Sequence, residues 1–197
     1  MTKTIDYYFT PASPYTYLGD ARLNDIAARH GAAVRIRPVS YGEIFPKTGG
    51  LPLPKRAPAR QAYRLIELER WREFLNIPLN LHPKHFPVPD RTASLMIIAA
   101  DHAEENAGAL VSAILSAVWA EDRDISNAET LKTIAKEVGL DGAAVFEAAE
   151  ADSAAETFDA YTQEALEIGV FGAPTYVYDD EMFWGADRLD FLDRALV

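Results

Sequence analysis

Hydrophobic and polar positions near the N-terminus follow the pattern of a strand, a helix and a second strand. Residues 4–10 are rich in β-branched and aromatic side chains, which predicts a strand. Ser13 and Pro14 suit the N-cap and the first turn of a helix, and apolar positions recur at helical spacing from there to Gly31. Polarity then alternates over residues 34–39, as in a second strand. A strand–helix–strand unit of this kind implies a parallel pair joined by a right-handed crossover.

The middle of the chain combines two proline-rich segments with a long run of helical periodicity. Residues 46–58 contain four prolines and two glycines, which predicts an irregular loop. A helix is expected over residues 59–75, and a second proline-rich loop follows over residues 78–89. The pattern Ser126–Glu129 is that of a capping box at the start of a later helix. The other helices expected from periodicity cover residues 92–102, 109–120, 126–139, 143–150 and 154–168.

Strand patterns return near the C-terminus. Residues 175–178 and 182–184 predict two strands joined by a turn, and Asp187 is the expected N-cap of a last helix that ends at residue 196. The two end blocks together form one mixed sheet, so the predicted fold class is α/β, with a thioredoxin-like layout and a large all-helical insertion. The expected boundaries place residues 1–45 and 169–197 in the thioredoxin-like domain and residues 46–168 in the helical insertion domain.

Composition narrows the class of protein. The chain has 197 residues, of which 49% are hydrophobic and 25% charged, as in ordinary globular domains. It has no apolar run of the roughly 18 residues that a membrane span needs, and its first residues lack the apolar region of a signal peptide. The absence of cysteine excludes disulfides, thiolate metal sites and cysteine-based catalysis. We therefore expect a soluble, cytoplasmic protein with no membrane partner.

Charge is distributed unevenly along the chain. The net charge is −11, but residues 1–91 carry a net +6 and residues 92–197 a net −17. An acidic chain is a poor general partner for nucleic acid, so none is expected. The basic half can collect small anions in one cleft. Alternatively, the charge blocks are simply the solvated faces of helices.

The first candidate site segment is Ser13-Pro14-Tyr15-Thr16, at the junction of the first strand and helix. In a thioredoxin-like fold this junction carries Cys-x-x-Cys, and here a hydroxyl stands in the first cysteine position. A helix N-terminus favours an anion such as a thiolate, and a serine hydroxyl can donate a hydrogen bond to that sulfur. Without sulfur of its own, the protein would have to borrow a thiol. The alternative is that Ser13 is only an N-cap.

Two further segments near the C-terminus carry candidate binding groups. The Gly172-Ala173-Pro174 step after a long helix suggests a cis proline, which would leave the Ala173 backbone free to bond an extended, peptide-like ligand. In the turn from Trp184 to Asp187, the aspartate can cap the following helix or pair with a ligand ammonium. Backbone N–H groups of the same turn can hold a ligand carboxylate.

Taken together, three motifs resemble a known enzyme family. Tyr8 to Leu18, Gly169 to Thr175 and Phe183 to Arg188 resemble the 2-hydroxychromene-2-carboxylate isomerases over essentially the whole chain. That family is related to the kappa-class glutathione transferases, and both belong to the DsbA-like branch of thioredoxin folds. The resemblance thus implies a DsbA-type mixed sheet, an isomerase of aromatic-compound catabolism and, as in many relatives, a homodimer.

The resemblance also implies glutathione as the cofactor. Ser13, as the catalytic residue, would face the glutathione sulfur and stabilise its thiolate. The thiolate would add to the chromene ring, the ring would open with rotation about the released bond, and elimination of the thiolate would give the trans product. Ala173 and Pro174 would pair with the cysteinyl part. The γ-glutamyl end would be held by Trp184, Gly185, Ala186 and Asp187. The substrate would be a small aromatic or unsaturated acid.

The chain departs from the family at one place on the substrate side. In the segment 41–50, relatives usually end with Gly-Asn, whose asparagine contacts ligand, whereas this chain has Gly50 and supplies no side chain. Lys47 in the same segment can bind an anionic substrate or lie on the surface as a solvated charge. No metal site is expected, because His82 and His85 have no carboxylate at ligand spacing.

Two other functions remain open from the sequence. One is a glutathione transferase or peroxidase of kappa type, in which the thiolate attacks an electrophile and the product leaves. The other is a non-catalytic thioredoxin-like module that holds extended peptides at the proline turn. Such a module would bind glutathione without changing the pKa of its thiol.

Overall fold

The computed structural model describes residues 3–197 and contains one mixed sheet, as the sequence predicts. Its four strands lie in the order β2–β1–β3–β4. β1 (Thr4–Phe9) pairs in parallel with β2 (Ala33–Pro38), which confirms the expected crossover unit. β3 (Thr175–Tyr178) and β4 (Glu181–Trp184) form an antiparallel hairpin whose first strand pairs with β1.

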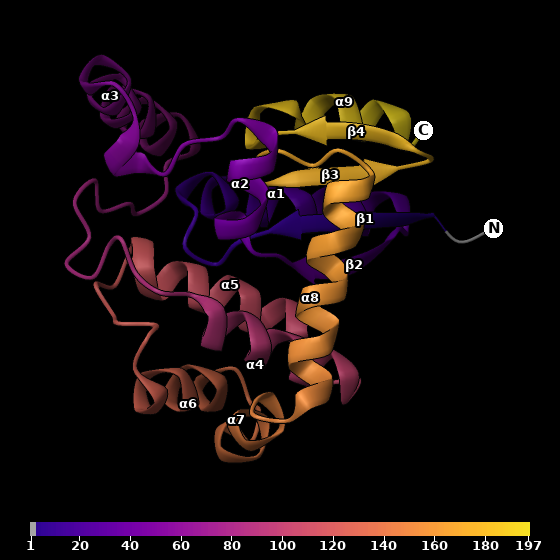
Figure 1. Cartoon of the computed structure of the whole chain (residues 1–197). Helices are drawn as coiled ribbons and strands as arrows, with labels where there is room; N and C mark the ends of the chain where they lie inside the picture. The colour runs from indigo at the N-terminus through magenta and orange to yellow at the C-terminus, as the bar shows by residue number, and fades with distance from the viewer. Residues whose placement is uncertain (1–2) are drawn as a thin grey trace.

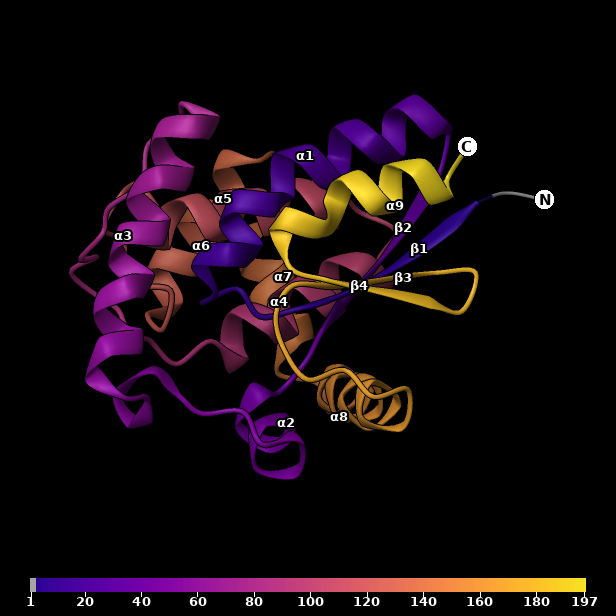
Figure 2. The same ribbon diagram turned by 90° about the horizontal axis from the view of Figure 1, so that it is seen from above.

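Helices cover both faces of this sheet. α1 (Pro14–His30) and α9 (Leu189–Ala195) lie side by side on one face, and α8 (Asp152–Glu167) and the short α2 (Tyr41–Thr48) lie on the other (Figure 2). The sheet is therefore the middle of three layers, and its inner strand β1 is mostly buried whereas the outer strands β2 and β4 keep exposed residues.

The helical insertion forms a lobe beyond the β2 edge of the sheet (Figure 1). α4 (Arg91–His102), α5 (Ala107–Trp119), α6 (Ala128–Glu137) and α7 (Gly142–Ala149) gather there. α3 (Pro58–Leu75) stands at the side of the molecule, beyond the end at which β1 stops and α1 begins (Figures 1 and 2).

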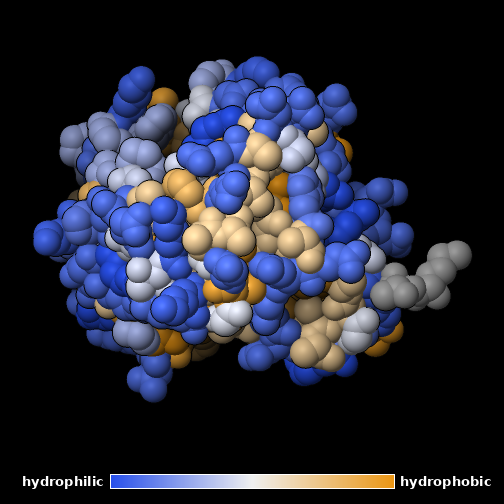
Figure 3. Space-filling view, turned by 90° about the horizontal axis from the view of Figure 1, so that it is seen from below, coloured by the Kyte–Doolittle hydropathy of each residue, from blue (hydrophilic) through white to orange (hydrophobic). Residues whose placement is uncertain are grey.

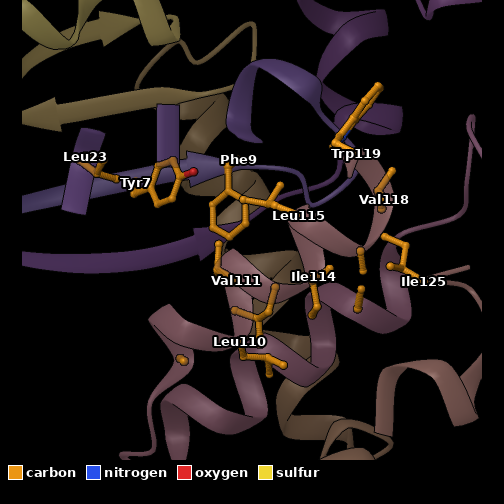
Figure 4. Packing of buried hydrophobic residues seen from close by; sticks show 14 of the residues in the cluster. Tyr7, Phe9, Leu23, Leu110, Val111, Ile114, Leu115, Val118, Trp119 and Ile125 are labelled. Atoms are coloured by element: carbon orange, nitrogen blue, oxygen red, sulfur yellow. The ribbon is translucent and has the colours of Figure 1, made fainter. Parts of the chain in front are cut away.

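The sheet and the helical lobe share one hydrophobic core. Tyr7 and Phe9 of β1 stack with ring centroids 4.5 Å apart, and Phe9 points toward Val111 and Leu115 of α5 (Figure 4). Trp119, at the end of α5, is fully buried in the same cluster. The position of α5 relative to β1 is thus set by a continuous apolar contact.

The segment predicted as an irregular loop over residues 46–58 contains regular structure at its start and in its middle. α2 runs through Pro46, and a 3-10 turn covers Leu53–Lys55. α2 persists because Tyr41 and Ile44 on its inner face are buried against α8, and burial of an amphipathic face outweighs the low helix propensity of proline. The prediction of a loop through Pro46 was therefore wrong.

A second correction concerns the start of α6. Asn127 is the N-cap, and its Oδ1 accepts a hydrogen bond from the Thr130 N–H at 3.0 Å. Ser126 does not form the predicted capping box, because its N–H and hydroxyl both donate to the carboxylate of Asp124. The helix begins one residue later than the pattern indicated.

The outer surface of the helical lobe is mostly hydrophilic. Seen from below, a central band of moderately hydrophobic residues is surrounded by hydrophilic ones (Figure 3). α7, which belongs to this lobe, carries several exposed alanines. Over residues 3–197, none of the helices has the length and apolar character that crossing a bilayer would require.

Candidate active site

Ser13 lies between the end of β1 and the first turn of α1. Its Oγ accepts a hydrogen bond from the Thr16 N–H at 3.3 Å, which confirms the predicted N-cap. The N–H of Tyr15 has no hydrogen-bond acceptor within residues 3–197, and the first turn of α1 contains no acidic residue. Ser13 is partly exposed, so a ligand anion can approach the positive end of α1 at this residue.

The proline turn opposite this junction has the predicted geometry. The Ala173–Pro174 peptide bond is cis, and within the described residues the Ala173 N–H and C=O make no hydrogen bond. The residues on either side are held firmly. The Gly172 carbonyl accepts bonds from the Tyr41 hydroxyl at 2.8 Å and the Thr175 hydroxyl at 2.6 Å, and the Pro174 carbonyl accepts one from Gly185 at 2.8 Å. A free donor and acceptor are thus presented on a fixed turn.

The turn after Trp184 differs from the prediction. Gly185 has a φ of 104°, which other residues rarely adopt, and a 3-10 turn over Ala186–Arg188 follows before α9 begins at Leu189. Asp187 is therefore inside a turn and does not cap the helix, so that prediction was wrong. Its carboxylate accepts a bond of 2.6 Å from the Arg188 guanidinium, and both side chains are about half exposed.

Strand pairing brings these segments to the same edge of the sheet. Thr175 pairs with Tyr8 on one side and with Trp184 on the other, so the end of β1, the proline turn and the end of β4 are adjacent. The α1 helix is fixed to the last turn by a 3.0 Å bond from Arg22 to the Ala186 carbonyl. The predicted residues of the first, second and third segments are therefore brought together.

The two predicted substrate residues lie at the end of α2. Lys47 is exposed and forms no ion pair or hydrogen bond within residues 3–197. A side chain at Gly50 would place its Cβ 2.2 Å from Cδ1 of Phe45. The phenylalanine ring thus occupies the space that any side chain at this position would need, including the asparagine expected from the resemblance. Neither residue is linked by a polar contact to the other predicted site residues.

Two residues that the sequence reasoning did not single out support the site. Tyr41 is buried, which raises the pKa of its phenol, and it supports the proline turn from α2. The Asp90 carboxylate accepts a hydrogen bond from the Thr10 hydroxyl, three residues before Ser13, and its burial raises its pKa. Both contacts join residues far apart in the sequence, so no local pattern indicated them.

The histidines of the loop before α4 do not gather other metal ligands. His85 Nδ1 lies 3.8 Å from the Asp124 carboxylate, and no third ligand joins them. In the part of the chain that the structure describes, no three His, Asp or Glu side chains are grouped as a metal site would require.

Comparison with known proteins identifies the family. The family model described as "DSBA-like thioredoxin domain" matches residues 4–197. The chain belongs to this family. The fold predicted from the sequence is therefore confirmed for this DsbA-like thioredoxin domain.

Individual relatives of this DsbA-like domain agree with the resemblance seen in its motifs. A 2-hydroxychromene-2-carboxylate isomerase from Sphingobium xenophagum is 34% identical over 199 residues, which cover all of both chains. A solved structure of a 2-hydroxychromene-2-carboxylate isomerase matches with a TM-score of 0.82 and 30% identity, covering 98% of this chain and 94% of that one. Glutathione S-transferase kappa 1 from Caenorhabditis elegans is 22% identical over 98% of this chain and 90% of its own length.

Proposed function

We propose that this chain is a glutathione-dependent isomerase of the 2-hydroxychromene-2-carboxylate type, acting on a small aromatic or unsaturated acid. The observation that carries the proposal is the placement of the Ser13 hydroxyl at the positive end of α1, beside a proline turn whose Ala173 backbone is free. The names of the isomerase relatives support the reaction type. A chain without cysteine needs a thiol from elsewhere to use such a site.

The residues present fit glutathione, which is itself a short peptide. The free N–H and C=O of Ala173 would pair with the cysteinyl backbone, as an added strand pairs with a sheet edge. The half-exposed Asp187 carboxylate would pair with the ammonium of the γ-glutamyl group. The N–H groups of Ala186 and Asp187 have no acceptor within residues 3–197 and would hold its carboxylate.

Bound glutathione would supply a thiolate that adds to an unsaturated carbon, so that the former double bond can rotate before the thiolate is eliminated again. The Ser13 hydroxyl accepts from the Thr16 N–H, so its own hydrogen is free to donate to the sulfur. Together with the Tyr15 N–H, this donor would stabilise the thiolate over the thiol, and each unit of lowered pKa corresponds to about 1.4 kcal/mol. Ser13 is thus a thiolate stabiliser rather than the nucleophile.

The second candidate is a transferase or peroxidase of kappa type, which the named kappa relative favours. The same thiol site would serve that reaction, and the difference lies in the second substrate. Gly50 and Phe45 alter the substrate side relative to the usual asparagine, so the two reactions must be separated by assay.

The test is turnover of 2-hydroxychromene-2-carboxylate by the purified protein with glutathione, with S-methylglutathione and with neither. The proposal predicts isomerisation only with free glutathione, and a loss of roughly 10- to 100-fold in kcat for Ser13→Ala, the effect of one hydrogen bond to a charged group. Asn127→Ala, which removes the cap of α6 instead, is the matched control. Isomerisation without glutathione would contradict the proposal. Conjugation of glutathione to an electrophile, with no isomerisation, would contradict it as well.

A further inference from the structure

Arg64 on α3 is a buried cation that forms no salt bridge in the part of the chain that the structure describes. The residue is 7% exposed, and within residues 3–197 it forms no salt bridge. Its Nη2 atom is buried and has no hydrogen-bond partner. A charge removed from water without a partner is strongly destabilising, so this guanidinium favours the approach of an anion.

Aromatic rings hold Arg64 in place but do not satisfy its donors. The guanidinium carbon lies 5.3 Å from the ring centroid of Phe86 and 5.7 Å from that of Trp119. These two rings pack against each other at 4.8 Å. The ring faces attract the cation but accept no strong hydrogen bonds, so the guanidinium is positioned with unused N–H groups.

The charged neighbours of Arg64 make no hydrogen bond with its guanidinium. Glu67 lies one turn further along α3, but its Oε2 accepts a hydrogen bond of 2.6 Å from the Tyr15 hydroxyl and forms no ion pair with Arg64. Arg56 adds a second positive charge nearby. Burial is the main cause that lowers the pKa of Arg64 and the Arg56 charge acts in the same direction, whereas Tyr15 and the Glu67 carboxylate oppose the shift.

Arg64 lies beside the proposed thiol site. Tyr15 belongs to the first turn of α1, two residues after Ser13, and its bond to Glu67 ties α3 to that turn. Figures 1 and 2 both place α3 at the end of the molecule at which β1 ends and α1 begins. An anion held by Arg64 would therefore lie near the sulfur that Ser13 is proposed to stabilise.

We propose that Arg64 binds the carboxylate of the second substrate and so selects unsaturated acids over neutral analogues. The inference rests on the proposed function, because it assigns the substrate side of the same site. A guanidinium offers two parallel N–H donors that match the two oxygens of a carboxylate, and its planar shape also fixes the orientation of the acid. Arg64 is thus a specificity-determining residue that touches the substrate away from the reacting carbon.

The experiment compares an acid with its neutral counterpart. Binding of trans-2-hydroxycinnamate and of its carboxamide is measured by calorimetry, with and without glutathione. The wild-type protein is expected to prefer the acid by about tenfold or more, the effect of one charge-assisted pair. Arg64→Met should bring this ratio close to one, and Arg64→Lys should keep part of it. Arg70→Met, an exposed arginine on the same helix, should leave the ratio unchanged.

Each outcome decides for or against the assignment. A purely structural Arg64 would weaken both ligands equally on substitution, and an unchanged ratio in Arg64→Met would overturn the proposal. A wild-type affinity ratio near one would also overturn the proposal. This measurement needs no variant, so it decides the question even if Arg64→Met does not fold. Glutathione binding measured on the same samples separates the two proposals: acid preference without any glutathione binding would refute the proposed function and leave the Arg64 site standing.

Discussion

The hydroxyl of Tyr41 donates a 2.8 Å hydrogen bond to the carbonyl of Gly172, 131 residues further along the chain. This bond joins α2 to the turn that presents the free backbone of Ala173. Thr175 supplies a second donor to the same carbonyl, so the turn is supported from two sides. The short helix that follows β2 thereby contributes to the position of the proposed glutathione site.

Removal of the Tyr41 hydroxyl tests this support. Tyr41→Phe should lower the free energy of unfolding by about 1 kcal/mol, because one buried bond is lost while Thr175 still satisfies the carbonyl. The Kd for glutathione should rise by a few-fold, since the turn loses one of its supports. Urea unfolding and calorimetry measure the two effects. Tyr63→Phe, which changes an exposed phenol on α3, is the control, and an equal effect there would contradict the account.

The close approach of α1 to the last turn gives a second prediction. A Cβ at Gly19 would lie 2.6 Å from the Tyr176 hydroxyl and 3.2 Å from the Ala186 Cβ. Gly19→Ala should therefore destabilise the protein by about 1–3 kcal/mol despite the better helix propensity of alanine, because it overpacks a buried contact. Thermal or urea unfolding measures the change.

Tyr176→Phe tests whether the Tyr176 hydroxyl is the atom that a side chain at position 19 would meet. The Tyr176 hydroxyl is buried without a hydrogen-bond partner, so its removal alone should be neutral or slightly stabilising. The double variant Gly19→Ala, Tyr176→Phe should recover much of the stability lost in Gly19→Ala, since the phenol oxygen is the nearest atom in the clash. Strict additivity of the two single changes would show that the hydroxyl is not the obstacle.

The features predictable from the sequence are those with local signals. The Ser13–Pro14 start of α1 and the cis Ala173–Pro174 step each depend on residues adjacent in the chain, and both appear in the structure as predicted. The mixed sheet followed from the same short patterns at the two ends of the chain.

The features that escaped prediction depend on distant contacts. Pro46 suggested a loop, but burial of the α2 face against α8 keeps the helix intact. Asp187 looked like an N-cap, yet the chain first makes a 3-10 turn after Gly185. Arg64 is buried because α3 packs against Phe86 and Trp119 in the folded chain. No local sequence pattern indicates these contacts.

Asp20 gives a prediction for pH dependence. Burial is the main cause that raises the pKa of this carboxyl to about 6, and the hydrogen bond from Ser112 opposes the shift. The unfolded carboxyl titrates near about pH 4, so between about pH 4 and 6 the native state holds a proton that the unfolded state has lost. The stabilising contribution of Asp20 is thus complete below about pH 4 and is lost as the pH rises through 6.

Asp20→Asn should remove this dependence. From pH 4 to pH 7 the wild type should lose up to about 3 kcal/mol of unfolding free energy relative to Asp20→Asn, because the pKa of the Asp20 carboxyl is raised by about two units. Urea unfolding at several pH values measures it. Asp25→Asn, which changes an exposed carboxyl on the same helix, is the control. A constant difference across this range for Asp20→Asn would refute the assignment.

The most direct test of the central claim is the thiol pKa of bound glutathione, followed by the ultraviolet absorbance of its thiolate as the pH is raised. On the wild-type protein the pKa should lie at least about one unit below the ordinary thiol value of about 8.5. It should return toward that value in Ser13→Ala and stay lowered in Asn127→Ala, which loses a helix cap far from the site. Glutathione that binds the wild type with an unchanged thiol pKa would contradict thiolate activation by Ser13.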